Sequence, residues 1–254
     1  MLEVSNLTKY YSGIPAIKDV SFTVGRGEVL GYLGPNGSGK TTTVSIAIGL
    51  IEPSAGSVRF DGHDISWDPV GLRRRLGYVP EDPHLYSFLS GREYLQLTGR
   101  LRQLPERALN RKIDGMLELL SIGSAADLSI GAYSKGMKQK ILISAALLHD
   151  PDLLIFDEPL SGLDVTTAIM FRHLVAALAG RGKTVLYSSH VLEVVEKICS
   201  QVIILRKGCV VADGSVKHLR ELMSSPSLED VFSQLALVED PEKTAGAMLD
   251  VIKA

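Results

Sequence analysis

The chain has 254 residues, enough for one large domain, or one domain with an insertion, around a sizeable core. Its 27 Lys and Arg against 29 Asp and Glu give a formal net charge of −2, which offers no electrostatic case for a dedicated nucleic-acid binder, so we expect no nucleic-acid partner. Stretches without a charged residue stay well short of the ~18 apolar residues that a spanning helix needs, and residues 1–4 do not resemble a signal peptide, so we expect a cytoplasmic protein.

The strand patterns along the chain are of two kinds. Residues 1–28 and 57–66 alternate polar and apolar side chains, which is typical of antiparallel strands with one exposed face. Residues 29–33, 153–156 and 184–187 are short apolar runs, each followed by a turn and a helical pattern. Such runs indicate parallel strands buried on both faces. The sequence therefore predicts an α/β fold with a parallel-sheet core and an N-terminal antiparallel β subdomain.

A helical lobe interrupts the parallel strands. Residues 88–150 are almost purely helical in period, and the simplest account is an insertion between two strands of the parallel sheet, so we place a helical subdomain at about residues 82–150. Two or three short helices follow Ser215. We expect one domain over residues 1–235 and a C-terminal helical tail over residues 236–254.

A glycine-rich segment follows the first apolar run. Residues 34–41 read GPNGSGKT, which satisfies G-x-x-x-x-G-K-[ST] between a predicted strand and a predicted helix over residues 42–50. Glycines let successive backbone N–H groups turn toward a polyphosphate, and a helix N-terminus adds about half a positive charge. Lys40 would reach the β and γ phosphates, and the Thr41 hydroxyl would bind the Mg²⁺ that bridges them. The alternative is a glycine-rich turn that binds nothing.

Two adjacent acids end the second apolar run. Asp157 and Glu158 follow residues 153–156, at the carboxyl end of the predicted strand. Successive side chains on extended backbone point to opposite sides, so we expect Asp157 to hold Mg²⁺ through water and Glu158 to face the attacking water as general base. A lone Asp-Glu pair is more often a charged turn, but a phosphate loop in the same chain reverses that preference.

With these motifs in place, the chain resembles the ATP-binding subunit of an ABC transporter over about residues 1–235. Residues 133–139 (YSKGMKQ) stand at the family's signature position, usually Leu-Ser-Gly-Gly-Gln. Ser134 and Gly136 match, whereas a lysine and a methionine replace the first glycine and the glutamine. The resemblance implies that this segment contacts the ATP held by the other subunit; without it, the segment is a helix start with a serine cap.

Two motifs after the acid pair also resemble the family. Residues 161–164 (SGLD) resemble its D-loop, with glycine where alanine is commoner. The resemblance implies that Asp164 bridges two subunits, and capping of a helix by the same carboxylate is compatible with that role. His190 follows the strand predicted to end at Ser188 and stands at the switch-histidine position, where an imidazole bonds the γ phosphate and senses its loss.

Tyr11 matches a family position and Glu81 departs from one. Residues 7–11 (LTKYY) resemble the loop whose aromatic ring stacks on adenine, and the distance from Lys9 favours Tyr11 over Tyr10. Glu81 stands where the family usually has the glutamine of its Q-loop. A carboxylate there could serve Mg²⁺ as an oxygen ligand, and the alternative is a solvated loop glutamate with no ligand role.

All of these residues converge on one predicted task, the binding and hydrolysis of MgATP. The candidate catalytic residues are Glu158 and His190; the nucleotide-binding residues are Tyr11, Gly34, Pro35, Asn36, Gly37, Ser38, Gly39, Lys40, Thr41 and Thr42; the signature residues acting on the other subunit are Ser134, Lys135, Gly136 and Met137; the D-loop residue is Asp164; and the metal ligands are Thr41, Glu81 and Asp157.

The resemblance implies an ATPase that binds ATP and Mg²⁺ between two copies in a head-to-tail homodimer, and whose opening on hydrolysis drives separate integral membrane permease subunits. Such a chain would lie at the inner face of the cell membrane. Residues 80–82 (PED), 133–137 (YSKGM) and 227–232 (SLEDVF) together look most like the branch that serves multi-span export permeases.

Three rival functions remain at the level of the sequence. The first is an ATPase of the same family without transport, in cofactor assembly or regulation. The second is a DNA-binding head of the chromosome-maintenance type, which the net charge and the lack of long heptad runs argue against. The third is a nucleotide-binding regulator that does not hydrolyse, which Glu158 and His190 argue against.

Overall fold

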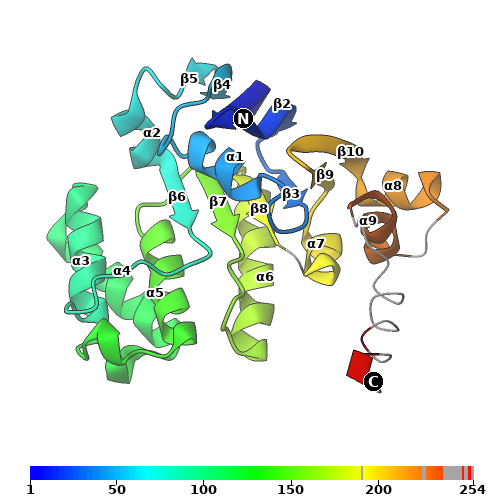
Figure 1. The fold of residues 1–254 in the computed structure, drawn as a ribbon. Coiled ribbons are helices and arrows are strands. Elements are labelled where there is room, and N and C mark those ends of the chain that lie inside the picture. The colour runs from blue at the N-terminus through cyan, green and yellow to red at the C-terminus, as the bar shows by residue number, and fades with distance from the viewer. Residues whose placement is uncertain (190, 225–226, 237–247, 249–250, 253–254) are drawn as a thin grey trace.

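Two sheets organise the chain in the computed structural model, which describes residues 1–189, 191–224, 227–236, 248 and 251–252 (Figure 1). A four-stranded sheet has the order β2-β1-β4-β5, and a six-stranded sheet has the order β10-β9-β3-β8-β7-β6. The strands are β1 (Leu2–Tyr11), β2 (Ile14–Val24), β3 (Val29–Leu33), β4 (Ala55–Phe60), β5 (His63–Asp64), β6 (Leu76–Val79), β7 (Leu153–Asp157), β8 (Thr184–Ser188), β9 (Gln201–Arg206) and β10 (Cys209–Ser215).

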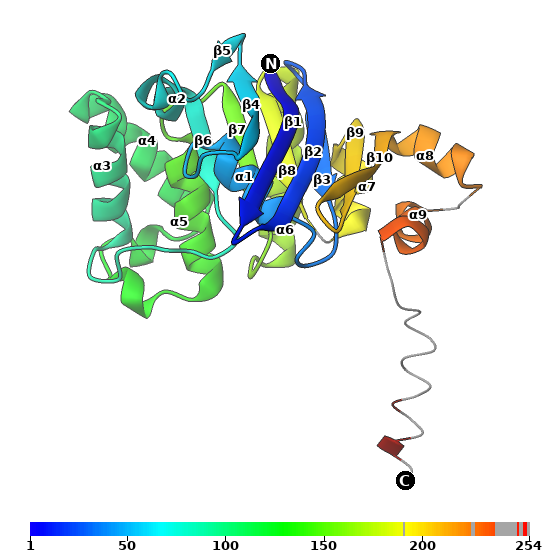
Figure 2. The ribbon, with the colours of Figure 1, turned by 45° about the horizontal axis from the view of Figure 1, so that its top comes forward.

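The antiparallel strands predicted over residues 1–28 and 57–66 form a sheet of their own, whereas β10 adds one antiparallel strand to the edge of the large sheet. Leu2 of β1 lies opposite Val24 of β2 on one side and opposite Phe60 of β4 on the other. These three side chains belong to the same buried cluster as Leu30 of β3 and Ile155 of β7. The four-stranded sheet thus packs across one face of the six-stranded sheet, as Figure 2 shows.

The parallel strands predicted from apolar runs are confirmed. Every residue of β3, β7 and β8 is buried, which explains why their sequences are apolar without alternation. β3 and β7 both pair with β8 in parallel register, with Val29 beside Val185 and Leu153 beside Thr184. The carboxyl ends of these strands therefore meet at one edge of the sheet, and the segments that follow them lie together there.

The predicted helical lobe lies between β6 and β7. The helices of the chain are α1 (Lys40–Ala47), α2 (Pro69–Arg75), α3 (Gly91–Leu101), α4 (Glu106–Leu119), α5 (Lys135–Leu147), α6 (Val165–Gly180), α7 (Leu192–Ile198), α8 (Val216–Leu222) and α9 (Leu228–Ala236), with single 3-10 turns at Gly123–Ala125 and Ile130–Ala132. α3, α4 and α5 enclose a core of their own, and α5 also contributes to the core beside the large sheet. The lobe and the sheet therefore share α5.

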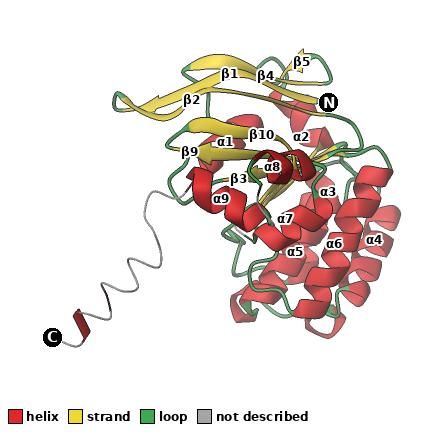
Figure 3. Cartoon of the chain, turned by 90° about the vertical axis from the view of Figure 1, so that its right-hand side faces the viewer, coloured by secondary structure: helices red, strands yellow, loops and turns green. Residues whose placement is uncertain are grey.

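The chain closes with two short helices beside the edge of the large sheet. α8 contacts β10, and α9 contacts both β9 and β10 (Figure 3). Most of the predicted tail, residues 236–254, lies outside the described residues. Within the part of the chain that the structure describes, no helix is both long and apolar enough to cross a membrane.

His149 joins the helical lobe to the parallel sheet. The Arg102 guanidinium, just after α3, donates from Nε to Nδ1 of His149 at 2.9 Å, and Nε2 of the ring lies 3.0 Å from the carbonyl of Leu76 at the start of β6. Because arginine only donates, Nδ1 accepts and Nε2 carries the hydrogen, so the ring is neutral. Burial, and then the charge of Arg102, lower the pKa of His149 to about 4.

We predict that this link makes stability depend on pH. Since the pKa of His149 is about 4 in the folded chain and 6.5 ordinarily, the unfolded chain binds more protons between these values, and the free energy of unfolding falls as the pH drops from 6.5 to 4. His149→Gln, whose amide can accept from Arg102 and donate to Leu76, should flatten this decline in urea unfolding measured across that range. His173→Gln, at an exposed histidine, is the control. Equal slopes for wild type and His149→Gln would refute the role of this ring.

Candidate functional site

A cavity of about 520 Å³ opens at the carboxyl end of β3, a size that accommodates a small-molecule ligand. Most of its lining comes from the predicted phosphate loop. The lining residues are Ala16, Gly34, Pro35, Asn36, Gly37, Gly39, Lys40, Thr41, Thr42, Glu81, Glu158 and Phe232. The phosphate loop, one of the two predicted acids and Glu81 therefore surround one space, although they lie far apart in the sequence.

The backbone of the phosphate loop requires glycine at two positions. Gly37 has φ +77° and Gly39 has φ +106°, and a Cβ on Gly39 would approach the carbonyl oxygen of Ala16 to 2.8 Å. The carbonyl of Ser38 accepts from the N–H of Gly208 at 3.0 Å, which ties the loop to the turn between β9 and β10. Ser38 is 2% exposed, and its hydroxyl has no partner among the described residues. Ser38, predicted to bind the nucleotide, does not line the cavity itself, but a glycine cradle of this shape fits an oxygen-rich ligand such as a phosphate chain.

Lys40 supplies the positive charge of the site. Its ammonium donates to the carbonyls of Gly34 at 2.7 Å and Pro35 at 3.3 Å, so it lies over the loop rather than in open solvent. Burial lowers the pKa of Lys40, while the charges of Glu158, Asp157 and Glu81 act to raise it. An ammonium held among carboxylates at the N-terminus of α1 is placed to bind negatively charged phosphate.

The acid pair does not alternate as expected. Asp157 ends β7 in extended conformation, but Glu158 has φ +47°, in the left-handed region, so the strand's alternation stops at Asp157. The N–H of Glu158 bonds the carbonyl of Ser188 at 3.0 Å, and its carboxylate accepts from the Ser189 hydroxyl at 3.3 Å. Both acids are buried, yet Glu158 reaches the cavity. A strained backbone at a residue that lines the site is common where function requires it.

Asp157 is a carboxylate in an unfavourable environment. Burial raises its pKa to about 6, the negative charges of Glu81 and Glu158 add to the rise, and the Ser188 hydroxyl and Lys40 act in the opposite direction. A divalent cation would relieve this repulsion.

The donor chemistry of the site fits Mg²⁺. Thr41, Asp157 and Glu81 offer hydroxyl and carboxylate oxygens, the ligands that Mg²⁺ prefers. Among the described residues, no group of three or more His, Cys, Asp or Glu side chains is gathered closely enough to hold a metal alone. Phosphate and water oxygens would therefore complete the coordination, which is usual for Mg²⁺ bound with a nucleotide.

The signature segment and the D-loop lie against each other within this chain. Ser134 caps α5 by accepting from the N–H of Met137 at 3.2 Å, and the stem of Lys135 crosses Gly162, where a Cβ would meet its carbon atoms at 2.9–3.3 Å. Gly136 packs on the carbonyl of Gly162. Lys135, which replaces the family's glycine, thus contacts Gly162, which replaces the family's alanine. The two departures from the family pattern therefore meet in the structure.

Two further predicted residues, Asp164 and Tyr11, do not line the cavity. Asp164 caps α6 by accepting from the N–H of Thr167 at 2.9 Å, as the capping alternative required, and its side chain remains 58% exposed. Tyr11, at the end of β1, is 49% exposed, and the ammonium of Lys9 lies 5.6 Å from its ring centroid. His190 lies outside the described residues.

Two lining residues were not predicted from the sequence. Ala16 enters from β2 and Phe232 from α9. The segment containing Phe232, residues 227–232, resembles the export branch of the family, but that resemblance does not predict a place in the cavity. Its apolar residues at positions 228, 231, 232 and 235 do indicate a helix with one packed face, but not where that face docks.

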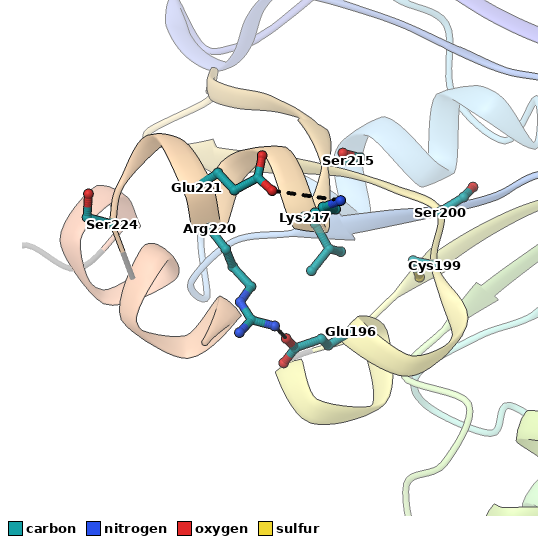
Figure 4. Close-up of a pocket in the computed structure, with 9 residues that line it drawn as sticks. Glu196, Cys199, Ser200, Ser215, Lys217, Arg220, Glu221 and Ser224 are labelled. Atoms are coloured by element: carbon teal, nitrogen blue, oxygen red, sulfur yellow. Dashed lines mark hydrogen bonds and ion pairs between the residues drawn. The ribbon is translucent and has the colours of Figure 1, made fainter. Parts of the chain in front are cut away.

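A second hollow, of about 670 Å³, lies between α7 and α8 (Figure 4). Its charged side chains pair with each other, Arg220 with Glu196 at 2.8 Å and Lys217 with Glu221 at 3.9 Å. Cys199 in its wall carries a free thiol. This hollow lacks a glycine-rich backbone cradle with a lysine beside it, which the other cavity has, so we assign the nucleotide site to the loop.

Known proteins are similar to this chain in sequence and in fold. The ABC transporter family matches residues 17–161, more than half of the chain. The ABC transporter ATP-binding protein NatA of Bacillus subtilis is 37% identical over 220 residues, covering 86% of this chain and 89% of that protein. Nod factor export ATP-binding protein I of Ralstonia nicotianae is 33% identical over 219 residues, covering 86% of this chain and 68% of that protein.

Solved structures extend the similarity to the whole architecture. An ATP-binding subunit of an ABC transporter superimposes with a TM-score of 0.87 at 33% identity, covering 92% of this chain and 98% of that one. The ATP-binding cassette MJ0796, a dimer in a post-hydrolysis state with ADP and Pi, superimposes with a TM-score of 0.78 at 25% identity, covering 85% of this chain and 98% of that one. Sequence, fold and site agree, and the chain belongs to the ABC transporter family as an ATP-binding subunit, an ATPase whose reaction is coupled to transport.

Proposed function

We propose that this chain drives an ABC exporter as a homodimer that closes on MgATP and opens after hydrolysis. The observation that carries the proposal is the meeting of Lys40, Glu158 and the phosphate loop around one cavity. The ATP-binding domain would span residues 1–235. Export is supported by the segments that look like the export branch and by the name of the Ralstonia relative, a Nod factor export ATP-binding protein.

The proposed chemistry assigns one role to each group of the site. The phosphate loop and Lys40 bind the triphosphate, Thr41 and Asp157 hold Mg²⁺, and Glu158 takes a proton from the attacking water. Mg²⁺, when bound, neutralises charge on the phosphates. His190 would bond the γ phosphate, and Tyr11 would stack on adenine.

Dimer closure would bring the signature of one copy to the ATP of the other. Two copies facing head to tail would present Ser134, Lys135, Gly136 and Met137 to the partner's phosphates, with the N-terminus of α5 and the lysine favouring negative charge. Asp164 would lie at the same interface. ATP then acts as a bridging ligand that binds the closed dimer better than the open one, and hydrolysis removes that difference.

A permease would dock beside the nucleotide site. Tyr86 and Phe88 are 56% and 77% exposed, and their rings lie 5.8 Å apart. They follow Glu81, which lines the cavity, after only a few residues. Leu85, which lies between Glu81 and Tyr86, packs against both the lobe core and the core beside the large sheet. Exposed aromatic side chains mark interaction surfaces, and this docking would hold the chain at the inner face of the membrane.

The dimer is tested by separating ATP binding from hydrolysis. Glu158→Gln should reduce hydrolysis about 100-fold or more, because the general base is lost, while MgATP still binds. Sizing chromatography with ATP should then show an accumulated dimer. Adding Ser134→Arg should return the protein to a monomer that still binds ATP. A Glu158→Gln protein that remains monomeric with ATP and turns over like the wild type would contradict both the base and the dimer.

The permease is tested by capture from membranes. The tagged chain, incubated with detergent-solubilised membranes of its source cells, should retain a multi-span membrane protein identified by mass spectrometry. Phe88→Ser should reduce that recovery without changing ATP binding. Leu119→Ser, at an 84% exposed position of α4, is the matched control. An ATP-binding wild type that captures no membrane protein would favour an ATPase of the family without transport.

The glutamate at position 81, where the family usually has glutamine, should affect the pH profile of hydrolysis and its Mg²⁺ requirement. The charge of Glu81 helps to raise the pKa of Asp157, so Glu81→Gln should lower that pKa and move the acid limb of the hydrolysis profile to lower pH. If the carboxylate also serves Mg²⁺, the metal concentration needed for half-maximal hydrolysis should increase. Both curves are measured on the two purified proteins. Superimposable curves would leave Glu81 as a solvated loop residue.

A further inference from the structure

We propose that Phe232 of α9 is a nucleotide-binding residue, against whose ring the nucleoside part of ATP packs. This rests on nucleotide binding at the phosphate loop. Phe232 is the only aromatic side chain among the described residues that line the cavity. It reaches the loop from the last described helix of the domain, more than 190 residues away in the sequence.

The backbone that carries Phe232 is held firmly in place. Leu228 and Val231 of α9 are fully buried in the core beside the large sheet, and Phe232 is half-buried at its border. The guanidinium of Arg206, at the end of β9, donates to the carbonyl of Leu235 at 3.3 Å. The ring is therefore presented to the cavity by a packed helix.

The cavity has one charged side and one apolar side. In the large sheet, β3 precedes the phosphate loop and lies between β9 and the pair β8 and β7. Asp157 ends β7 and Glu158 follows it, whereas α9 packs on β9. Lys40 attracts the γ phosphate and the acids attract its cation, which leaves the nucleoside on the β9 side.

Ala16 lies on the β9 side as well. The N–H of Lys18, two residues along β2, donates to Gly208 in the β9–β10 turn at 2.8 Å. The hairpin of β1 and β2 and the helix α9 therefore approach the loop from the same edge, with the Phe232 ring and the Ala16 methyl group as apolar surface. A nucleobase or ribose leaving the phosphate loop on this side meets that surface. Aromatic rings stack on any base, so the contact should favour nucleotides over bare phosphate without selecting adenine strongly.

The test compares ligands with and without a nucleoside on the full-length protein. Calorimetric titration in Mg²⁺ buffer measures the affinities of ATP, GTP and inorganic triphosphate. Phe232→Ala should weaken ATP and GTP roughly tenfold and leave triphosphate unchanged, since base–aromatic contacts contribute on this scale. Phe232→Tyr should retain ATP affinity. Phe232→Leu keeps the apolar packing but removes the ring, and it replaces the alanine variant if that fails to fold.

Two controls separate this contact from general effects. Leu235→Ala removes a packed side chain of the same helix that does not line the cavity, so it should leave ATP affinity within about twofold. Lys40→Ala should abolish binding of all three ligands. If Lys40→Ala has no effect, the phosphate-loop assignment itself fails. If Lys40→Ala acts as expected, the role of Phe232 is overturned by unchanged ATP affinity in its variants, by an equal loss for triphosphate, or by an equal loss in Leu235→Ala.

Discussion

The balance of charge around Lys40 is the constraint on which the rest of the structure depends. One ammonium lies within electrostatic reach of two buried acids, Asp157 and Glu158, and of the exposed Glu81. Such a set is costly to assemble, because burial penalises the charges of Lys40, Asp157 and Glu158. The parallel register of β3, β8, β7 and β6 brings these groups to one sheet edge, and the two surrounding cores keep them there. The excess of negative charge makes the site a natural receptor for a cation together with its phosphate ligand.

Much of this arrangement follows from local sequence. β3, β7 and β8 were predictable because strands buried on both faces must be apolar throughout, and the phosphate loop because its glycines permit backbone angles that other residues rarely adopt. The sequence left open whether Asp164 caps a helix, and in the structure it caps α6.

What escaped prediction depends on contacts between distant segments. The left-handed backbone of Glu158 arises where β7 meets the end of β8, and strand periodicity contains no signal for it. The proximity of Lys135 to Gly162 arises from packing of α5 on the loop after β7. The sequence indicates that α9 is a helix with one apolar face. It does not indicate that this face packs on β9, because that contact joins distant segments.

The packing of α5 in two hydrophobic cores limits how the lobe can move. Leu142 and Ile143 pack with the sheet, while Ile141 and Ala145 pack with α3 and α4. Closely packed cores resist continuous deformation, so the lobe cannot swing away as a detached body without opening one of them. Because Ser134 caps α5, a rigid movement of the lobe relative to the sheet would carry the start of the signature segment with it.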